Sequence, residues 1–76
     1  MEKNENWVRV GDFLKRTRIK KGLTQEEVSK KAGVSICSLQ FAEQGRQKLG
    51  LKNAYKVEMA LGLEEGTLEI IEKNKE

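Results

Sequence analysis

Apolar residues along the chain recur at spacings of three and four rather than two, which predicts helices and no strands. The first helical stretch ends near Lys20 and Lys21, because cations favour the last turn of a helix and Gly22 follows as a terminator. Trp7 and Val8 precede this stretch and are expected to extend the helix, with the Trp7 side chain either packing on Val10 or Phe13 or covering a partner. The apolar face of this first helix is formed by Val10, Phe13, Leu14 and Thr17.

Two short helices joined by a tight turn are predicted in the middle of the chain. Thr24 and Glu27 form a capping box, in which each side chain accepts from the backbone amide of the other residue. The helix that they open stops at Gly33. Ser35 is the N-cap of the next helix, which covers residues 36–44. A turn this short makes the two helices cross steeply.

Two further helices follow. The fourth is predicted from about Leu51 to Leu61, and Gly62 closes it. The fifth is predicted from Glu65 to Lys73, with Leu68 and Ile71 facing the core and acids in its first turn. The residues of the fourth helix that we expect to face inward are Leu51, Ala54, Val57, Ala60 and Leu61.

The composition supports one small domain. A length of 76 residues leaves no room for a second domain. Apolar residues make up 37% of the chain and charged residues 36%, a balance that permits a thin core and argues against disorder. We therefore expect a single all-α domain over residues 1–76, with frayed ends that include residues 72–76.

Histidine is absent and Cys37 is the single cysteine. This composition excludes disulfide frameworks, Cys/His zinc sites and histidine-dependent catalytic triads. No pair of acid and base marks a catalytic cleft, which argues against an enzyme. We therefore expect no catalytic residue, metal, cofactor or small-molecule substrate.

No stretch of the chain is apolar enough to enter a membrane. The longest nearly apolar run, residues 59–63, is far shorter than a span. Residues 1–6 lack the apolar region of a signal peptide. We expect a cytoplasmic protein without a membrane partner, and a lone thiol agrees with that reducing compartment.

Charge is unevenly divided along the chain. Residues 9–56 contain twelve Lys and Arg against four Asp and Glu, a net charge of +8. Residues 57–76 contain two against six, a net charge of −4. The basic part favours a polyanion and the acidic part would repel one, although two solvated helical surfaces of opposite sign explain the same counts.

Several short motifs occur in register in the two middle helices and after them. They are residues 23–28 (LTQEEV), 33–35 (GVS), 43–45 (EQG) and 60–63 (ALGL), together with Leu39. In these motifs the chain resembles the Xre-type helix-turn-helix proteins, the family of phage repressors and Cro, over residues 10–71 without a gap. The resemblance implies a compact five-helix, phage-repressor-like domain, a helix-turn-helix made by the second and third helices, and double-stranded DNA as partner.

The residues at the predicted turn fit such a helix pair. The fold needs a small residue in its first helix, a glycine at the turn and an apolar residue in its second helix. Ser29, Gly33 and Leu39 occupy these places. We expect the Ser29 hydroxyl to donate back to a helix carbonyl. The alternative is that Ser29 is an ordinary surface residue.

Arg18 and Glu43 are the polar pair that the resemblance singles out. In the family the matching residues form a salt bridge between the first and third helices, so Arg18 would bind the Glu43 carboxylate with two hydrogen bonds. The role would be architectural rather than catalytic. The alternative is two unrelated surface charges.

Helix ends and loop amides suggest contacts to DNA phosphates. Gln25 lies at the start of the second helix, where unpaired amides and the helix dipole attract an anion, and the family uses this residue in that way. Each of these polar residues, taken alone, is better explained as a solvated surface residue, but together they form a basic, amide-rich rim around the third helix, and that arrangement favours nucleic acid. The residues that we expect to contact phosphates are Gln25, Ser35, Gln44, Arg46, Gln47, Lys48, Lys52 and Asn53.

Base reading would fall to the third helix. The residues that we expect to contact bases are Ile36, Cys37, Ser38, Gln40 and Phe41. Apolar side chains cannot make the bidentate hydrogen bonds that identify guanine or adenine, but they can contact the thymine methyl group. Exposed Ile36 and Phe41 therefore indicate either methyl readout or a protein partner. The alternative for Phe41 is that it packs on the edge of the core.

The function indicated by these features is sequence-specific regulation of transcription, as a repressor or controller. A homodimer would insert residues 36–44 of each copy into the major groove of a palindromic operator. The alternative is a protein-interaction module, antitoxin-like or adaptor, that keeps the fold without base readout. The candidate dimer-interface residues are Leu63, Leu68, Ile70 and Ile71.

Overall fold

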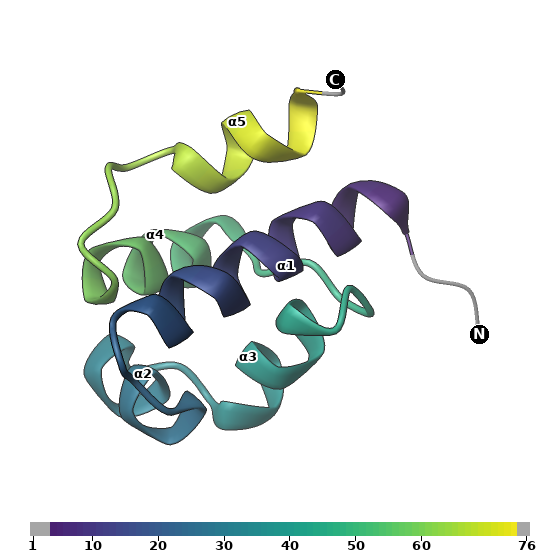
Figure 1. Ribbon diagram of the computed structural model, residues 1–76. Helices are drawn as coiled ribbons and strands as arrows, with labels where there is room; N and C mark the ends of the chain where they lie inside the picture. Colours follow the sequence, from purple (N-terminus) through teal and green to yellow (C-terminus); the bar gives the residue numbers. More distant parts are fainter. Residues whose placement is uncertain (1–3, 75–76) are drawn as a thin grey trace.

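The computed structural model describes residues 4–74, which form five helices and no strand (Figure 1). The predicted all-α architecture is confirmed. None of the helices in this part of the chain is long and apolar enough to cross a membrane. The helices are α1 (Glu5–Lys20), α2 (Gln25–Ala32), α3 (Ile36–Glu43), α4 (Leu51–Ala60) and α5 (Thr67–Lys73).

The first helix is longer than its apolar face requires. The Asn4 side chain caps it, since Oδ1 accepts from the amides of Asn6 (2.9 Å) and Trp7 (3.1 Å). Trp7 and Val8 therefore extend α1, as the sequence predicts. At the other end of the chain, residues 72 and 73 belong to α5 rather than to a frayed end, and residues 75–76 lie outside the described part.

The second and third helices begin and end where the sequence predicts. Thr24 and Glu27 form the capping box, with distances of 3.0 and 2.8 Å between side-chain oxygen and amide nitrogen. Gly33 ends α2 at a φ of 74°, a conformation that favours glycine. Ser35 caps α3 by accepting from the Ser38 amide at 3.1 Å. The helix pair is thus defined by contacts over three or four residues.

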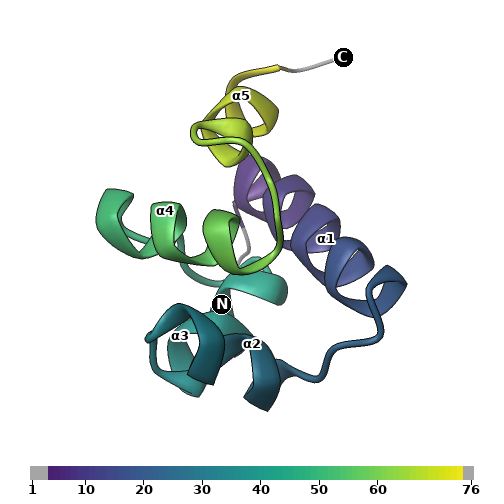
Figure 2. The same ribbon diagram turned by 90° about the vertical axis from the view of Figure 1, so that its left-hand side faces the viewer.

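Close packing against α1 positions α3. A Cβ atom on Gly11 of α1 would collide with the carbonyl oxygens of Ala42 and Glu43 at the end of α3. The two helices can therefore approach this closely only because residue 11 has no side chain. Figures 1 and 2 show α2 and α3 together at the bottom of the molecule and α5 at the top.

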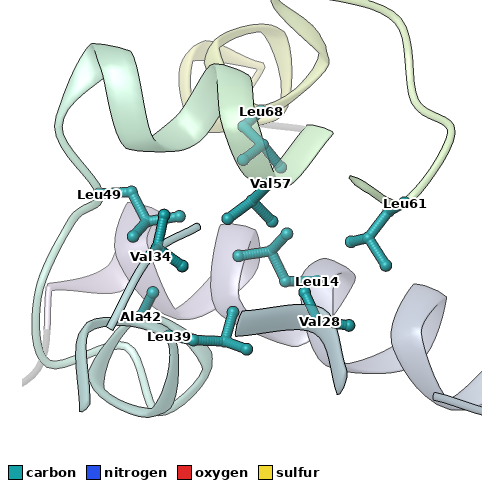
Figure 3. Packing of buried hydrophobic residues seen from close by; sticks show 9 residues of the cluster. All are labelled: Leu14, Val28, Val34, Leu39, Ala42, Leu49, Val57, Leu61 and Leu68. Atoms are coloured by element: carbon teal, nitrogen blue, oxygen red, sulfur yellow. The ribbon is translucent and has the colours of Figure 1, made fainter. Parts of the chain in front are cut away.

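The core draws one or more residues from each helix and from the segment between α3 and α4 (Figure 3). Leu51 is an exception to the sequence prediction, because its side chain is 83% exposed. It is the first residue of α4 and lies at the end of the helix beyond the core, while Leu49 before the helix is buried instead. The cluster consists of Leu14, Val28, Val34, Leu39, Ala42, Leu49, Val57, Leu61 and Leu68.

Two charged side chains that the sequence analysis did not single out hold α5 in place. Glu58 of α4 is 2% exposed, and its carboxylate accepts from the backbone amides of Gly66 (3.0 Å) and Leu68 (2.9 Å). At the other end, Arg9 Nη2 donates to the carbonyl oxygens of Ile71 (3.2 Å) and Glu72 (2.8 Å). Helix α5 therefore begins at Thr67, two residues later than predicted, where Glu58 satisfies its first amides.

Candidate nucleic-acid interface

A buried ion pair joins α1 to the end of α3. Arg18 Nε and Nη2 donate to the two carboxylate oxygens of Glu43 at 2.7 and 3.1 Å, and Nη1 donates to the Leu23 carbonyl at 2.9 Å. The two side chains are 11% and 3% exposed. The expected bidentate pair is therefore present, and the alternative of two unrelated surface charges does not describe it. The pair fixes α3 relative to α1 and to the segment before α2.

Gln25 opens α2 and lies against the same ion pair. Its Nε2 donates to Glu43 Oε1 at 3.0 Å, and its Oε1 accepts from Gln40 Nε2 at 3.3 Å. The side chain expected to face a phosphate thus also contacts two residues of α3. One N–H of the carboxamide and the amides at the start of α2 remain able to donate to an anion.

Ser29 lies on the buried side of α2. The side chain is buried, and its hydroxyl donates to the Glu26 carbonyl at 3.3 Å. The expected bond back to the helix is confirmed, and the surface alternative is wrong. The hydroxyl is thus satisfied within its own helix, so it adds no unpaired polar group to the interior of the protein.

The outer surface of α3 carries the candidate base-reading residues. Ile36 and Cys37 are exposed at its start, and Ser38, Gln40 and Phe41 are half-buried. Phe41 is not among the partly buried side chains that pack on the core cluster. The first turn of α3 is therefore accessible to a ligand, and its apolar side chains are part of the accessible surface.

Hydroxyl groups at the start of α3 are already partly engaged. Ser35 Oγ accepts from the Ser38 amide at 3.1 Å and donates to Ser38 Oγ at 3.0 Å. The hydroxyl proton of Ser38 is then left to donate elsewhere. Ser35 can offer its backbone to a phosphate, but its hydroxyl is committed to the cap.

The remaining candidate phosphate contacts surround the end of α3. Gln44, Arg46 and Gln47 are exposed where the chain leaves the helix. Lys52 is exposed and Asn53 half-buried at the start of α4. Lys48 differs, because its Nζ is 3.1 Å from Glu72 Oε1 of α5, so that part of its charge is compensated within the protein.

The candidate dimer residues divide into buried and accessible ones. Leu68 is 4% exposed within its own chain, so it belongs to the core and cannot contact a partner. Leu63 and Ile71 are half-buried, and Ile70 is 65% exposed. The expectation for Leu68 as an interface residue is therefore corrected, because α5 uses it to pack on α1 and α4.

A second apolar surface lies on α4 and was missed. Leu51, Tyr55 and Met59 are all exposed and are spaced by four residues, which puts them on one face of the helix. We call these three residues the α4 stripe. The spacing of four residues is visible in the sequence, but the stripe was not recognised because Leu51 was expected to face the core.

Comparisons with known proteins agree with this geometry. The model of the Helix-turn-helix family matches residues 14–68. The restriction-modification controller protein C.AhdI from Aeromonas hydrophila is 29% identical, with a TM-score of 0.80 over 86% of this chain and 98% of that one. The clp gene regulator ClgR from Corynebacterium glutamicum is 25% identical, with a TM-score of 0.78 over 93% of this chain and 76% of that one. None of the curated proteins compared with the sequence matches it.

The motifs, the five helices and these comparisons lead to one assignment. The family match covers most of the chain, from Leu14 in α1 to Leu68 in α5, and so includes the Arg18–Glu43 pair and both helices of the turn. The resemblance that the sequence motifs indicate is therefore confirmed. The chain belongs to the Xre-like helix-turn-helix family of DNA-binding transcription regulators.

Proposed function

We propose that the protein binds operator DNA in a sequence-specific manner by inserting residues 36–44 into the major groove. The observation that carries this proposal is that α3 is held in a fixed position relative to α1. Its far end is tied to α1 by the buried Arg18–Glu43 pair, while its first turn remains accessible. A fixed helix with an accessible N-terminal turn is what docking in the major groove requires.

Phosphate contacts would flank that helix on both sides. On one side lie the amides at the start of α2 and the free N–H of Gln25. On the other lie the exposed side chains of Arg46 and Gln47, followed by Lys52. These contacts fix the register of the protein on DNA without selecting sequence.

Base selection would be mostly apolar. Ile36 and Phe41 are suited to thymine methyl groups, and the free hydroxyl proton of Ser38 is suited to an acceptor such as guanine O6 or thymine O4. Gln40 is the remaining polar reader. An operator rich in thymine opposite the start of α3 is the expected consequence.

The protein would act as a homodimer on a palindromic operator. Ile70 and Ile71 of α5, with Leu63 before it, supply apolar surface for a partner, and the α4 stripe is a second exposed apolar surface. The acidic segment 57–76 contains these interface residues of α5 and would face away from DNA. The relative C.AhdI is a controller of restriction and modification, which supports a repressor or controller role for this chain.

Selection from randomised duplex DNA at near-physiological salt tests the proposal. Enrichment of a two-fold symmetric motif, with half-sites about 10 base pairs apart, is expected for the dimer. Binding that enriches no motif and vanishes as salt rises contradicts it. That result would favour a protein-interaction module, for which the exposed Ile36 on the outer surface of α3 is the supporting observation.

A further inference from the structure

Three cations are expected to contact DNA phosphates beyond the end of α3, and one of them is paired within the protein. Lys48 Nζ lies 3.1 Å from Glu72 Oε1 of α5. Arg46 and Lys52 are exposed, and within residues 4–74 neither forms an ion pair. Lys48 therefore differs from the other two, because its charge is compensated in the free protein.

The acidic partner of this pair is held more closely than the basic one. The Glu72 side chain is 21% exposed and the Lys48 side chain 55%. The backbone at Glu72 is also fixed, because Arg9 Nη2 donates to the carbonyl oxygens of Ile71 and Glu72 at 3.2 and 2.8 Å. Leu49, which follows Lys48, is buried in the core. The part of the pair that can move is therefore the flexible lysine side chain.

Negative charge is concentrated at the end of α5. The last carbonyl groups of a helix carry a partial negative charge, and Glu72 adds a carboxylate in the last turn. Arg9 and Lys48 bind a carbonyl oxygen and the carboxylate of this turn from other parts of the chain. Lys73, the cation of α5 itself, pairs with Glu69 at 3.1 Å. An ammonium group that moves from Glu72 to a phosphate leaves an uncompensated charge behind.

We propose that Glu72 masks Lys48, as an internal competitor of the DNA phosphates for the lysine ammonium group. The inference rests on the proposed binding of operator DNA. Carboxylate and phosphate oxygens bind the same NH3+ group, so Lys48 adds to DNA binding only the difference between a phosphate contact and the lost pair with Glu72. The end of α5 thereby limits the affinity of the protein for all DNA sequences alike.

Masking differs from simple repulsion between DNA and the acidic segment 57–76. Repulsion acts through space, so removing a carboxylate raises the affinity for DNA whichever residue occupies position 48. Masking acts through one side chain, so removing the Glu72 carboxylate raises the affinity only while Lys48 is present. Combining changes at the two positions therefore distinguishes the two explanations.

The experiment measures the affinity of the wild type and five variants for a selected operator duplex and for a duplex of unrelated sequence, over a range of salt concentrations. Glu69 is the matched control, because it also lies on α5 and its partner Lys73 is not an expected phosphate contact. Glutamine keeps the length of glutamate and removes its charge. The variants are Glu72→Gln, Glu69→Gln, Lys48→Gln and the two double variants that combine Lys48→Gln with each glutamate change.

Glu72→Gln should bind both duplexes about twofold to fivefold more tightly, the range expected when an exposed ion pair no longer competes. Its affinity should also fall more steeply with salt, by up to about 0.9 in the slope of log K against log salt concentration, since one more phosphate is neutralised. With Lys48→Gln present, Glu72→Gln should gain no more than Glu69→Gln does. A gain from Glu72→Gln that is the same with and without Lys48 assigns the effect to repulsion and overturns the inference.

Nuclear magnetic resonance of the free protein separates this inference from the proposed function. In Glu72→Gln, the signals of the Lys48 Cε methylene group should shift, while those of Lys52 stay in place. Unshifted Lys48 signals overturn the masking whatever the DNA results are. A wild-type protein that selects an operator, combined with a Glu72→Gln variant that gains no affinity, refutes the masking and leaves the proposed function intact. A protein that selects no sequence, yet gains affinity for any duplex through Lys48 in Glu72→Gln, refutes the proposed function and supports the masking.

Discussion

The helix pair α2–α3 and the helix α5 are held in place in opposite ways. At the starts of α2 and α3, backbone amides donate to side chains three residues away. The side chains are those of Thr24 and Glu27 at α2 and that of Ser35 at α3. Helix α5 has no side-chain cap of its own at Gly66. Its first amides are bound by Glu58, and its last carbonyls by Arg9, more than 60 residues earlier.

This difference has a physical consequence for how each region opens. Local caps survive when tertiary contacts loosen, because both partners lie on the same short segment. Remote carboxylate and guanidinium partners are lost as soon as α5 leaves the body of the protein. Helix α5 is also the shortest of the five described helices, so its packing and these two charges decide its stability.

The largest expected effect comes from the ion pair under the helix-turn-helix. Glu43→Ala leaves the Arg18 guanidinium buried without its partner, which should lower the free energy of unfolding by about 3–5 kcal/mol. In a domain of this size such a loss approaches the whole stability. Urea denaturation followed by circular dichroism measures it. A loss below about 1 kcal/mol would mean that Arg18 finds solvent or another acceptor once Glu43 is removed.

The next effect separates the two regions. Glu58→Gln replaces one of the two acceptors at the start of α5 by a donor, so one amide loses its partner, at a cost of about 2–3 kcal/mol. Hydrogen exchange should rise for the amides of α5 and stay nearly constant in α2 and α3. Equal acceleration in all helices would show that α5 and the helix pair open together, and the comparison would then fail.

The sequence predicted most of the fold because most of the fold is locally determined. The capping box at Thr24, the glycine stop at Gly33 and the apolar spacing of α1 all depend on residues a few positions apart. Leu51 was misassigned because periodicity does not show that the core ends before the helix does. Glu58 and Arg9 were missed because their partners are backbone groups brought near only by the folded chain.

The candidate site was predictable to a smaller extent. Family motifs located Arg18 and Glu43 and the accessible turn of α3. The contact of Gln25 with Gln40 could not be foreseen, because it depends on how steeply α2 and α3 cross. Long polar side chains have many rotamers, and only the packed surroundings select one of them.

A smaller effect is expected at the local cap. Thr24→Ala removes the acceptor of the Glu27 amide and should cost about 1 kcal/mol. The increase in hydrogen exchange should be confined to the start of α2, because the ion pair and the core still hold the rest of the helix. Thr24→Ser keeps the hydroxyl and serves as the control, with a change of a few tenths of a kcal/mol expected. A matching loss in both variants would assign the effect to the threonine methyl group instead.

The smallest effect is expected at Leu51. The apolar spacing of α4 predicts that this residue faces the core, but its side chain is exposed. Leu51→Ala should change the free energy of unfolding by no more than about 0.5 kcal/mol, whereas Leu49→Ala removes a buried side chain and should cost about 2–4 kcal/mol. Both variants are unfolded in urea at two protein concentrations, because a dimer that uses the α4 stripe adds a concentration-dependent term. A Leu51→Ala loss that grows with concentration would assign Leu51 to the dimer interface. A loss equal to that of Leu49→Ala at both concentrations would place Leu51 in the core, as its spacing suggests.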